Sequence, residues 1–291
     1  MKKVEITSPR TQLGAIMRLV RARKKRVSVE ALPEICYVAP SVVLDDGRLN
    51  KYRALCGFKE SQGVPFIFPQ IMAFSLMMEF LGSQYCPWSA LGMIHLANRI
   101  EQYEPLHVGD NLRVELRTGD LISHEKGQVF NIKFQLFRDN QLVWQAIQSM
   151  LCRGISQPLG ESYKSILDSD FVLSRQAVFS APRNIGRHYG KVSGDLNPIH
   201  LSSLTAKAFG FKRAIAHGMW SKARALSALL PNEQVVEATS VVEFKRPMYL
   251  PGVASLWTNR KDHSAEFELR DSKGEELHLR GQLSYLSLIH I

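Results

Sequence analysis

The sequence lacks several features that would assign it to common classes of protein. It has no run of 18 apolar residues, so we expect no transmembrane helix, and its N-terminus lacks the apolar core of a signal peptide. It has no Gly-x-Ser-x-Gly motif, which argues against a Ser-His-Asp hydrolase with a nucleophile elbow. Its four cysteines match no metal-binding spacing such as Cys-x-x-Cys. We therefore expect reduced thiols, no disulfide and no metal at Cys36, Cys56, Cys86 and Cys152.

The charge of the chain is concentrated at one end. Lysine and arginine number 37 against 27 acidic residues, a net charge of +10. Residues 1–30 carry nine basic and two acidic side chains, including the run Arg21–Arg26. This segment could attract phosphates, a membrane surface or an acidic carrier protein, or it could be a solvated basic helix. No aromatic residues are interleaved with the basic ones, so we expect no nucleic-acid partner. A mitochondrial transit peptide is conceivable, but a bacterial cytoplasmic location is preferred.

The rest of the chain shows one pattern of elements twice. Residues 69–81 are apolar nearly all round and predict a buried helix. Residues 35–45 read as extended and residues 46–65 as polar and turn-rich. Alternating strands are predicted near 111–118, 129–138 and 142–152, with a hairpin turn at Asp139–Asn140. A second set of strands is predicted near 240–247, 253–260, 264–271 and 276–286, with a hairpin turn at 271–274.

Weak internal similarity at equivalent points supports two repeats. Glu104–Gly109 corresponds to Arg246–Gly252, and Gln135–Asp139 corresponds to Glu268–Asp271. The sequence therefore predicts four segments: a basic segment 1–30, a first repeat 31–153, a breaker-rich linker 154–172 and a second repeat 173–291.

The second repeat contains a cluster of residues suited to acid/base chemistry. Asp195, Asn197 and His200 lie within six residues, in a segment with the turn formers Gly194 and Pro198. A carboxylate beside an imidazole can activate water or transfer a proton near neutral pH. On this pattern alone, Asp and Asn before a helix are more often caps than catalytic residues. We place Asp195 and His200 on a turn, where their side chains can converge.

A second block follows closely. His217-Gly218 precedes an apolar stretch with helical spacing that ends at Pro231. The backbone N–H of Gly218 would then lie at a helix N-terminus, where the helix dipole favours a developing negative charge. A donor at that position could hold an enolate oxygen. The alternative is that His217 only shapes the helix entrance.

Together the two blocks resemble the signature of the MaoC-like, R-specific enoyl-CoA hydratase (hydratase 2) family. The first block matches through an aromatic residue, a Ser-Gly-Asp-x-Asn-Pro-aliphatic-His run and a small residue six positions on, here Tyr189, Ser193, Gly194, Asp195, Asn197, Pro198, Ile199, His200 and Ala206. The second matches through Ile215, His217, Gly218 and Met219. Some family members have a Ser eight residues after this glycine, where this chain has Leu226.

The resemblance implies an α+β double hot-dog fold, in which a central helix is wrapped by an antiparallel sheet in each repeat. It also implies the reversible syn addition of water to trans-2-enoyl thioesters. Asp195 and His200 would hold the water, Asn197 would orient the pair and the Gly218 amide would bind the thioester oxygen. Substrate-binding positions would be Tyr189, Ser193, His217, Met219 and Trp220.

The same resemblance sets expectations for partners. No cofactor is expected, the substrate would be a thioester of CoA or acyl carrier protein, and a homodimer is conceivable. The first repeat lacks the motif and could have left room for a longer acyl chain. Two other functions stay open: a hot-dog thioesterase, and a non-catalytic module that binds acyl thioesters or docks the carrier.

Overall fold

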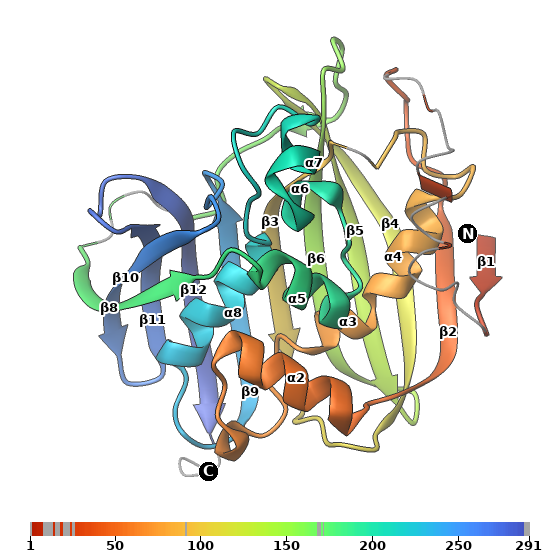
Figure 1. Cartoon of the computed structure of the whole chain (residues 1–291). Helices are drawn as coiled ribbons and strands as arrows, with labels where there is room; N and C mark the ends of the chain where they lie inside the picture. The colour runs from red at the N-terminus through yellow and green to blue at the C-terminus, as the bar shows by residue number, and fades with distance from the viewer. Residues whose placement is uncertain are drawn as a thin grey trace.

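One large sheet runs through the whole molecule. The computed structural model describes residues 2–7, 14, 18, 19, 24, 27–90, 92–167, 170 and 172–287. Its sheet has twelve strands in the order β1-β2-β4-β5-β6-β3-β9-β12-β11-β10-β8, with β7 paired to β4 (Figure 1). Apart from Lys24, the basic run Arg21–Arg26 lies outside the described residues.

The two halves of this sheet have the same internal order. In the first half, the strands are β2 Ile35–Val43, β3 Ile94–Gln102, β4 Asn111–His124, β5 Gly127–Arg138 and β6 Gln141–Arg153. In the second half, they are β8 Ser174–Ala181, β9 Val235–Phe244, β10 Gly252–Lys261, β11 Ser264–Asp271 and β12 Leu277–Ser287. The strands of each half can be counted in chain order. From the outer edge of the sheet to its middle, both halves then read first, third, fourth, fifth and second strand. The predicted α+β double hot-dog is thereby confirmed.

The halves meet where β3 pairs antiparallel with β9, from Ala97 opposite Glu243 to Gln102 opposite Ala238. Two short strands lie outside this scheme, β1 Lys2–Glu5 and β7 Glu161–Ser162. The segment after β7 is tied to the second half, because the Tyr163 hydroxyl donates to Glu243 Oε1 over 3.1 Å. The predicted boundaries of the linker and of the two repeats stay predictions.

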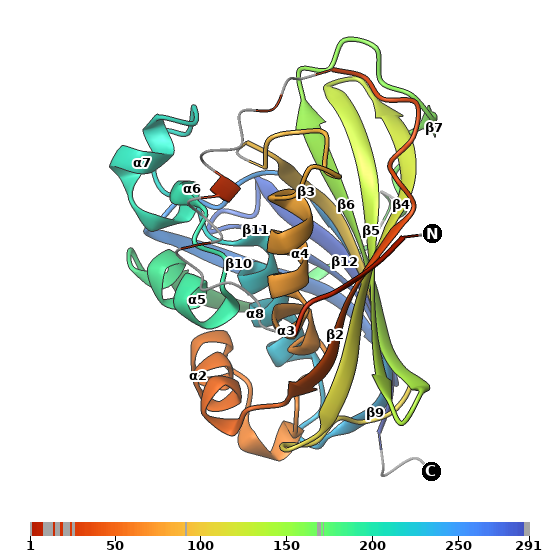
Figure 2. The same cartoon turned by 90° about the vertical axis from the view of Figure 1, so that its right-hand side faces the viewer.

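The helices lie on one face of the curved sheet (Figure 2). They are α2 Asp46–Cys56, α3 Pro69–Met72, α4 Phe74–Leu81, α5 Ile185–Ser193, α6 Pro198–Leu201, α7 Ser203–Lys207 and α8 Gly218–Leu229, with a 3₁₀ turn at Glu60–Gln62. The buried helix predicted over 69–81 is divided at Ala73 into α3 and α4. The predicted helix in the second repeat is α8.

The prediction of turn-rich structure over 46–65 was wrong for its first half. Residues Asp46–Cys56 form α2, because Asp45 caps its first turn by accepting from Arg48 N, over 2.6 Å. Gly57 ends the helix in the left-handed conformation, with φ 78°. Strand β8 was not predicted.

The core lies between the sheet and these helices. On β5, every second side chain is fully buried, namely Phe130, Ile132, Phe134 and Leu136. Each such side chain stabilises the fold by roughly 2 kcal/mol relative to exposure. The predicted hairpin turns are confirmed, since Asp139 and Asn140 have φ 48° and 67° and Gly274 N donates to Asp271 O.

All four cysteines are buried and none forms a disulfide, at Cys36, Cys56, Cys86 and Cys152. Among the described residues, no helix is both long and apolar enough to cross a membrane.

Candidate active site

The acid/base cluster begins at the end of α5. Gly194 ends this helix in the left-handed conformation, φ 89°, and turns the chain towards Asp195. Asp195 N donates to Ser193 Oγ and Asn197 N donates to Asp195 Oδ1, both over 3.1 Å. These local hydrogen bonds fix the carboxylate, whose side chain remains 32% exposed.

The segment is more helical than the sequence indicated. His200 lies in the short helix α6, so its predicted position on a turn was wrong, whereas Asp195 does lie in the turn before it. The side chain of Asn197 caps α6, because its Oδ1 accepts from Ile199 N over 3.4 Å. Asn197 contacts Asp195 through its backbone, and its predicted role in orienting the pair stays a prediction.

Two glycines allow α5 to lie close to this segment. A Cβ atom on Gly186 would come within 2.1 Å of His200 O, and one on Gly190 within 2.7 Å of Asp195 O. Both neighbours are backbone atoms, which cannot move aside as a flexible side chain can. The spacing of these glycines therefore brings α5 against the backbone of both candidate catalytic residues.

The protonation of His200 follows from its contacts. Its Nδ1 lies 2.8 Å from Ile215 O, and a carbonyl oxygen can only accept, so Nδ1 carries a proton. Burial, and then the neighbouring His217, lower the pKa of His200 to about 3. The ring is therefore neutral near pH 7, and its Nε2 keeps a lone pair that can take a proton from water.

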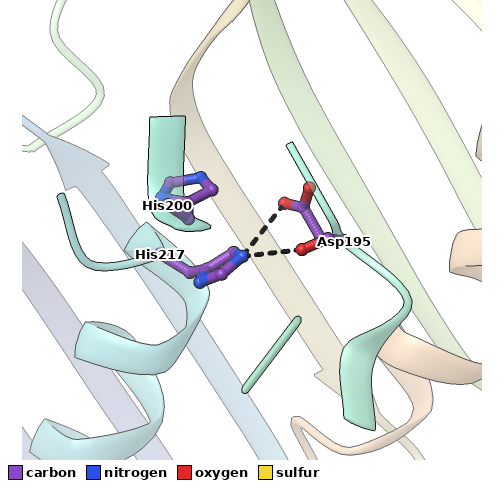
Figure 3. A group of neighbouring side chains, drawn as sticks. All are labelled: Asp195, His200 and His217. Atoms are coloured by element: carbon purple, nitrogen blue, oxygen red, sulfur yellow. Dashed lines mark hydrogen bonds and ion pairs between the residues drawn. The ribbon is translucent and has the colours of Figure 1, made fainter. Parts of the chain in front are cut away.

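His217 joins the two candidate catalytic residues (Figure 3). Its Nε2 donates to Asp195 O over 2.9 Å and lies 3.8 Å from Asp195 Oδ2. Its ring stacks on His200, with centroids 3.7 Å apart, and lies 5.0 Å from the ring of Tyr189. Burial lowers the pKa of His217, and its side chain is 3% exposed. His217 therefore holds Asp195 and His200 in a fixed relation.

The same three side chains also have the ligand types and the spacing of a metal site. One ligand atom from each of Asp195, His200 and His217 lies within 4.8 Å of the others. One nitrogen of each imidazole already donates to a backbone carbonyl, so each ring has one nitrogen left for a ligand or a proton.

The cluster faces a cavity of about 300 Å³ built from both repeats. The second repeat contributes the predicted site residues Tyr189, Ser193, Asp195, Asn197, His200, His217, Gly218 and Met219. Trp220 packs in the core instead, where its Nε1 donates to Leu55 O over 2.9 Å. Its predicted role in substrate binding has no contact here to support it.

The sequence indicated that the first repeat could help to bind the acyl chain, but not which of its residues would line the cavity. Gln70, Met77, His95, Gln148 and Met150 line the same cavity. They come from α3, α4, β3 and β6 and share no short motif. Only the methionines carried a signal, since Met77 belongs to a Met-rich helix that could line an adaptable pocket.

Backbone N–H donors and basic side chains lie along the cavity. Gly218 is the first residue of α8 and follows its N-cap, His217, so the first-turn amides have no acceptor within the helix. Arg153, Lys245 and Arg246 are exposed residues that also line the cavity. A negatively charged group can therefore bind at the first-turn amides of α8 or at the exposed basic side chains.

Comparison with known proteins agrees with this geometry. Residues 174–251, which hold Asp195, His200 and Gly218, match the sequence model of the MaoC like domain. This part of the second repeat therefore resembles a MaoC like domain. The chain is 28% identical over 268 residues to 3-hydroxyacyl-thioester dehydratase X of Mycobacterium tuberculosis, covering 90% of this chain and 94% of that protein.

Solved structures extend the likeness to both repeats. A crystal structure of HtdX from M. tuberculosis superposes with a TM-score of 0.73 at 27% identity, covering 86% of this chain and 100% of that one. Another M. tuberculosis protein, described as a double hot-dog, gives a TM-score of 0.56 at 13% identity. It covers 86% of this chain and 95% of that one, and this second likeness concerns the fold alone.

Proposed function

We propose that this protein catalyses the reversible hydration of trans-2-enoyl thioesters to (R)-3-hydroxyacyl thioesters. The observation that carries the proposal is the convergence of Asp195 and His200 on one cavity. The His200 imidazole stacks on the His217 ring, the partly exposed Asp195 carboxylate lies 3.8 Å from His217 Nε2, and ligand atoms of the three side chains lie within 4.8 Å of one another. Asp195 Oδ2 and His200 Nε2 can therefore both bind one water. The related dehydratase of M. tuberculosis supports the same reaction class.

The proposed mechanism needs only groups of this chain. Water held between the Asp195 carboxylate and His200 Nε2 adds its oxygen to Cβ of the enoyl group. One proton of that water passes to the Asp195–His200 pair, the pair delivers one proton to Cα, and the second proton of the water stays on the new hydroxyl. Negative charge that develops on the thioester oxygen is stabilised by the Gly218 amide at the start of α8.

The carrier is proposed from the basic rim. CoA and acyl carrier protein both present the acyl group on a phosphopantetheine arm. The exposed Arg246 suits its phosphate, and Lys245, which also pairs with Glu243 Oε2 over 2.8 Å, lies next to it in the chain. We also propose that the enzyme acts in the cytoplasm. A monomer and a homodimer are both compatible with it, and light scattering of the purified protein distinguishes them.

The test is hydration of crotonyl-CoA and trans-2-decenoyl-CoA, followed by the loss of enoyl-thioester absorbance, with chiral analysis of the product. Formation of the (R)-3-hydroxy product supports the proposal, and the ratio of the two rates reports the length of the acyl site. If CoA thioesters are inert, the assay is repeated on acyl carrier protein. No hydration on either carrier, or release of free thiol instead, rejects the proposal.

A further inference from the structure

The cavity contains buried amides that the proposed mechanism does not use. Gln70 on α3 is 3% exposed and Gln148 on β6 is 4% exposed, yet both line the cavity. Neither Gln70 Nε2 nor Gln148 Oε1 has a hydrogen-bond partner among the described residues. Buried amide atoms are rarely left unpaired, so each such atom suggests a ligand or ordered water.

The contacts of Asn98 fix which way Gln70 points. Asn98 Nδ2 donates to Ile147 O over 3.5 Å, and a carbonyl oxygen can only accept, so Asn98 Oδ1 points the other way. There it lies 2.8 Å from Nζ of Lys222, which is fully buried on α8 and also lies 3.3 Å from the carbonyl oxygens of Asn98 and Ser240. Burial lowers the pKa of this lysine well below its ordinary value.

The orientation of the Asn98 amide in turn fixes that of the Gln70 amide. With Oδ1 facing Lys222, Asn98 Nδ2 lies 3.4 Å from Gln70 Oε1, which must therefore accept. Gln70 Nε2 is then the atom left over, and it is a hydrogen-bond donor.

Gln148 is oriented by His95 in the same manner. Burial lowers the pKa of His95 to about 3, so the ring is neutral and has a single N–H. A hydrogen bond with the backbone of Ala97 raises this pKa, as expected where the ring N–H donates to a carbonyl. Gln148 Nε2 lies 3.4 Å from His95 Nε2, and because an amide nitrogen only donates, His95 Nε2 accepts; Gln148 Oε1 is then the atom without a partner.

The free donor and the free acceptor belong to one small region. Asn98, which bonds Gln70, is the cross-strand partner of Gln148 in the pairing of β3 with β6. A hydroxyl group can accept from one amide and donate to the other at once, and an alkyl chain can do neither.

We propose that Gln70 and Gln148 form a subsite for an acyl chain that carries a hydroxyl group beyond Cβ. The inference rests on the proposed function, because it assigns the acyl end of the same cavity. A second hollow of about 90 Å³ shares the apolar residues Phe74, Met77, Met93 and Met150 with this cavity, and also Asp195 and Asn197. Its apolar side would hold the alkyl part of the chain.

Burial places this subsite with the acyl chain rather than with the carrier arm. The exposed basic residues Lys245 and Arg246 mark the entrance, where the phosphate of the arm would lie, whereas Gln70 and Gln148 are almost fully enclosed. A plain alkyl chain would remove water from both amides and replace none of their hydrogen bonds. Sites built from unpaired polar groups discriminate strongly against ligands that lack the matching group.

The test uses saturated thioesters, which bind without turnover. Dissociation constants are measured by calorimetry for octanoyl-CoA and for octanoyl-CoA hydroxylated at carbon 5, 6, 7 or 8. Wild-type protein is expected to bind at least one hydroxylated form about tenfold more tightly than octanoyl-CoA. Gln70→Met and Gln148→Met, which keep the side-chain length, should each abolish most of that preference. Gln135→Met is the matched control, because Gln135 lies on β5 and is not among the residues that line the cavity.

Three outcomes would overturn the subsite. Wild-type protein could bind every hydroxylated form no better than octanoyl-CoA. Both variants could keep the preference. Both variants could weaken all CoA thioesters equally, which would assign the amides to the pantetheine arm. Hydration of trans-2-octenoyl-CoA is followed separately, so failure of the proposed reaction is distinguishable from failure of the subsite.

Discussion

His200 and Asp195 are prepared for proton transfer in different ways. The backbone of Ile215 holds the proton of His200 on Nδ1, while Asp195 receives one backbone N–H at Oδ1 and keeps Oδ2 for a ligand. His217 donates to the backbone carbonyl of Asp195 and stacks on His200, so it acts through the other two residues.

Removing either group should stop most of the proposed reaction while leaving the protein folded. Asp195→Asn and His200→Ala are each expected to lower kcat for crotonyl-CoA hydration by about a hundredfold or more, the usual scale for an acid/base group. His188→Ala and Asp262→Asn make the same chemical changes at exposed positions and should keep wild-type rates. Near-normal turnover in either active-site variant would remove that residue from the mechanism.

The pH dependence of the rate tests the protonation state of His200. A histidine with an ordinary pKa near 6.5 would be about nine-tenths protonated at pH 5.5, and the rate would fall about tenfold from its value at pH 7.5. Burial lowers the pKa of His200 to about 3, so the neutral base persists across this range. We expect kcat/KM to stay within about twofold between pH 7.5 and 5.5. An acid limb centred near pH 6.5 in a folded sample would contradict this.

Residues with a motif could be predicted, and residues placed by long-range packing could not. Asp195, His200, His217 and Gly218 are close in sequence, and the structure brings all four to the cavity. His95 and Gln148 are more than 40 residues upstream of that block, and only the pairing of β3 with β6 brings them together. Trp220 follows the motif directly, yet the helical turn directs it into the core.

At the scale of one helix, α5 packs closely against the backbone of the candidate catalytic segment and supports it. Its glycines face the backbone of that segment, where no side chain would fit. Glycine in a helix interior costs about 1 kcal/mol relative to alanine, and close approach of two backbones accounts for it here.

Filling this contact should reduce activity despite better helix propensity. In Gly190→Ala, the new methyl group would meet Asp195 O at 2.7 Å, so the turn that carries Asp195 must shift. We expect kcat to fall at least about tenfold, because small displacements of a catalytic group are costly. The matched control is Gly47→Ala in α2, whose nearest contact would be Asp45 Oδ1 at 3.5 Å. That variant should keep its activity, and equal activity in both variants would refute this supporting role.

Helices and strands could be predicted from the sequence where a single hydrophobic pattern, such as alternation along a strand, was clear. The meander strands were predicted because they alternate, and their hairpin turns carry Asp139–Asn140 and Asp271–Gly274. Helix α2 was missed because its polar composition resembles a loop, and its helical state depends on caps at Asp45 and Gly57. The division of α3 from α4 at Ala73 has no equivalent in the sequence pattern.

At the scale of the molecule, the two repeats form one unit with a single motif-bearing site. Weak similarity between the halves was enough to predict the repeat, but nothing in it indicated that α2 of the first repeat holds α5 of the second. Arg48 makes this contact: its Nε donates to Val192 O over 2.8 Å, and its Nη2 donates to Ser193 O over 3.3 Å and Ile71 O over 2.9 Å.

Arg48 is therefore expected to act as a positioning residue almost 150 positions from the catalytic turn. Arg48→Ala should lower kcat about tenfold with little change in KM, since the carbonyls it binds come immediately before Asp195 while the cavity walls remain. Arg48→Lys should recover only part of the rate, because an ammonium group cannot reach all three carbonyls as a guanidinium fork does. Arg53→Ala on the same helix is the control: Arg53 binds Gly63 O within the first repeat, so its loss should leave kcat unchanged. Equal effects of the two alanine variants would mean that α2 contributes stability alone.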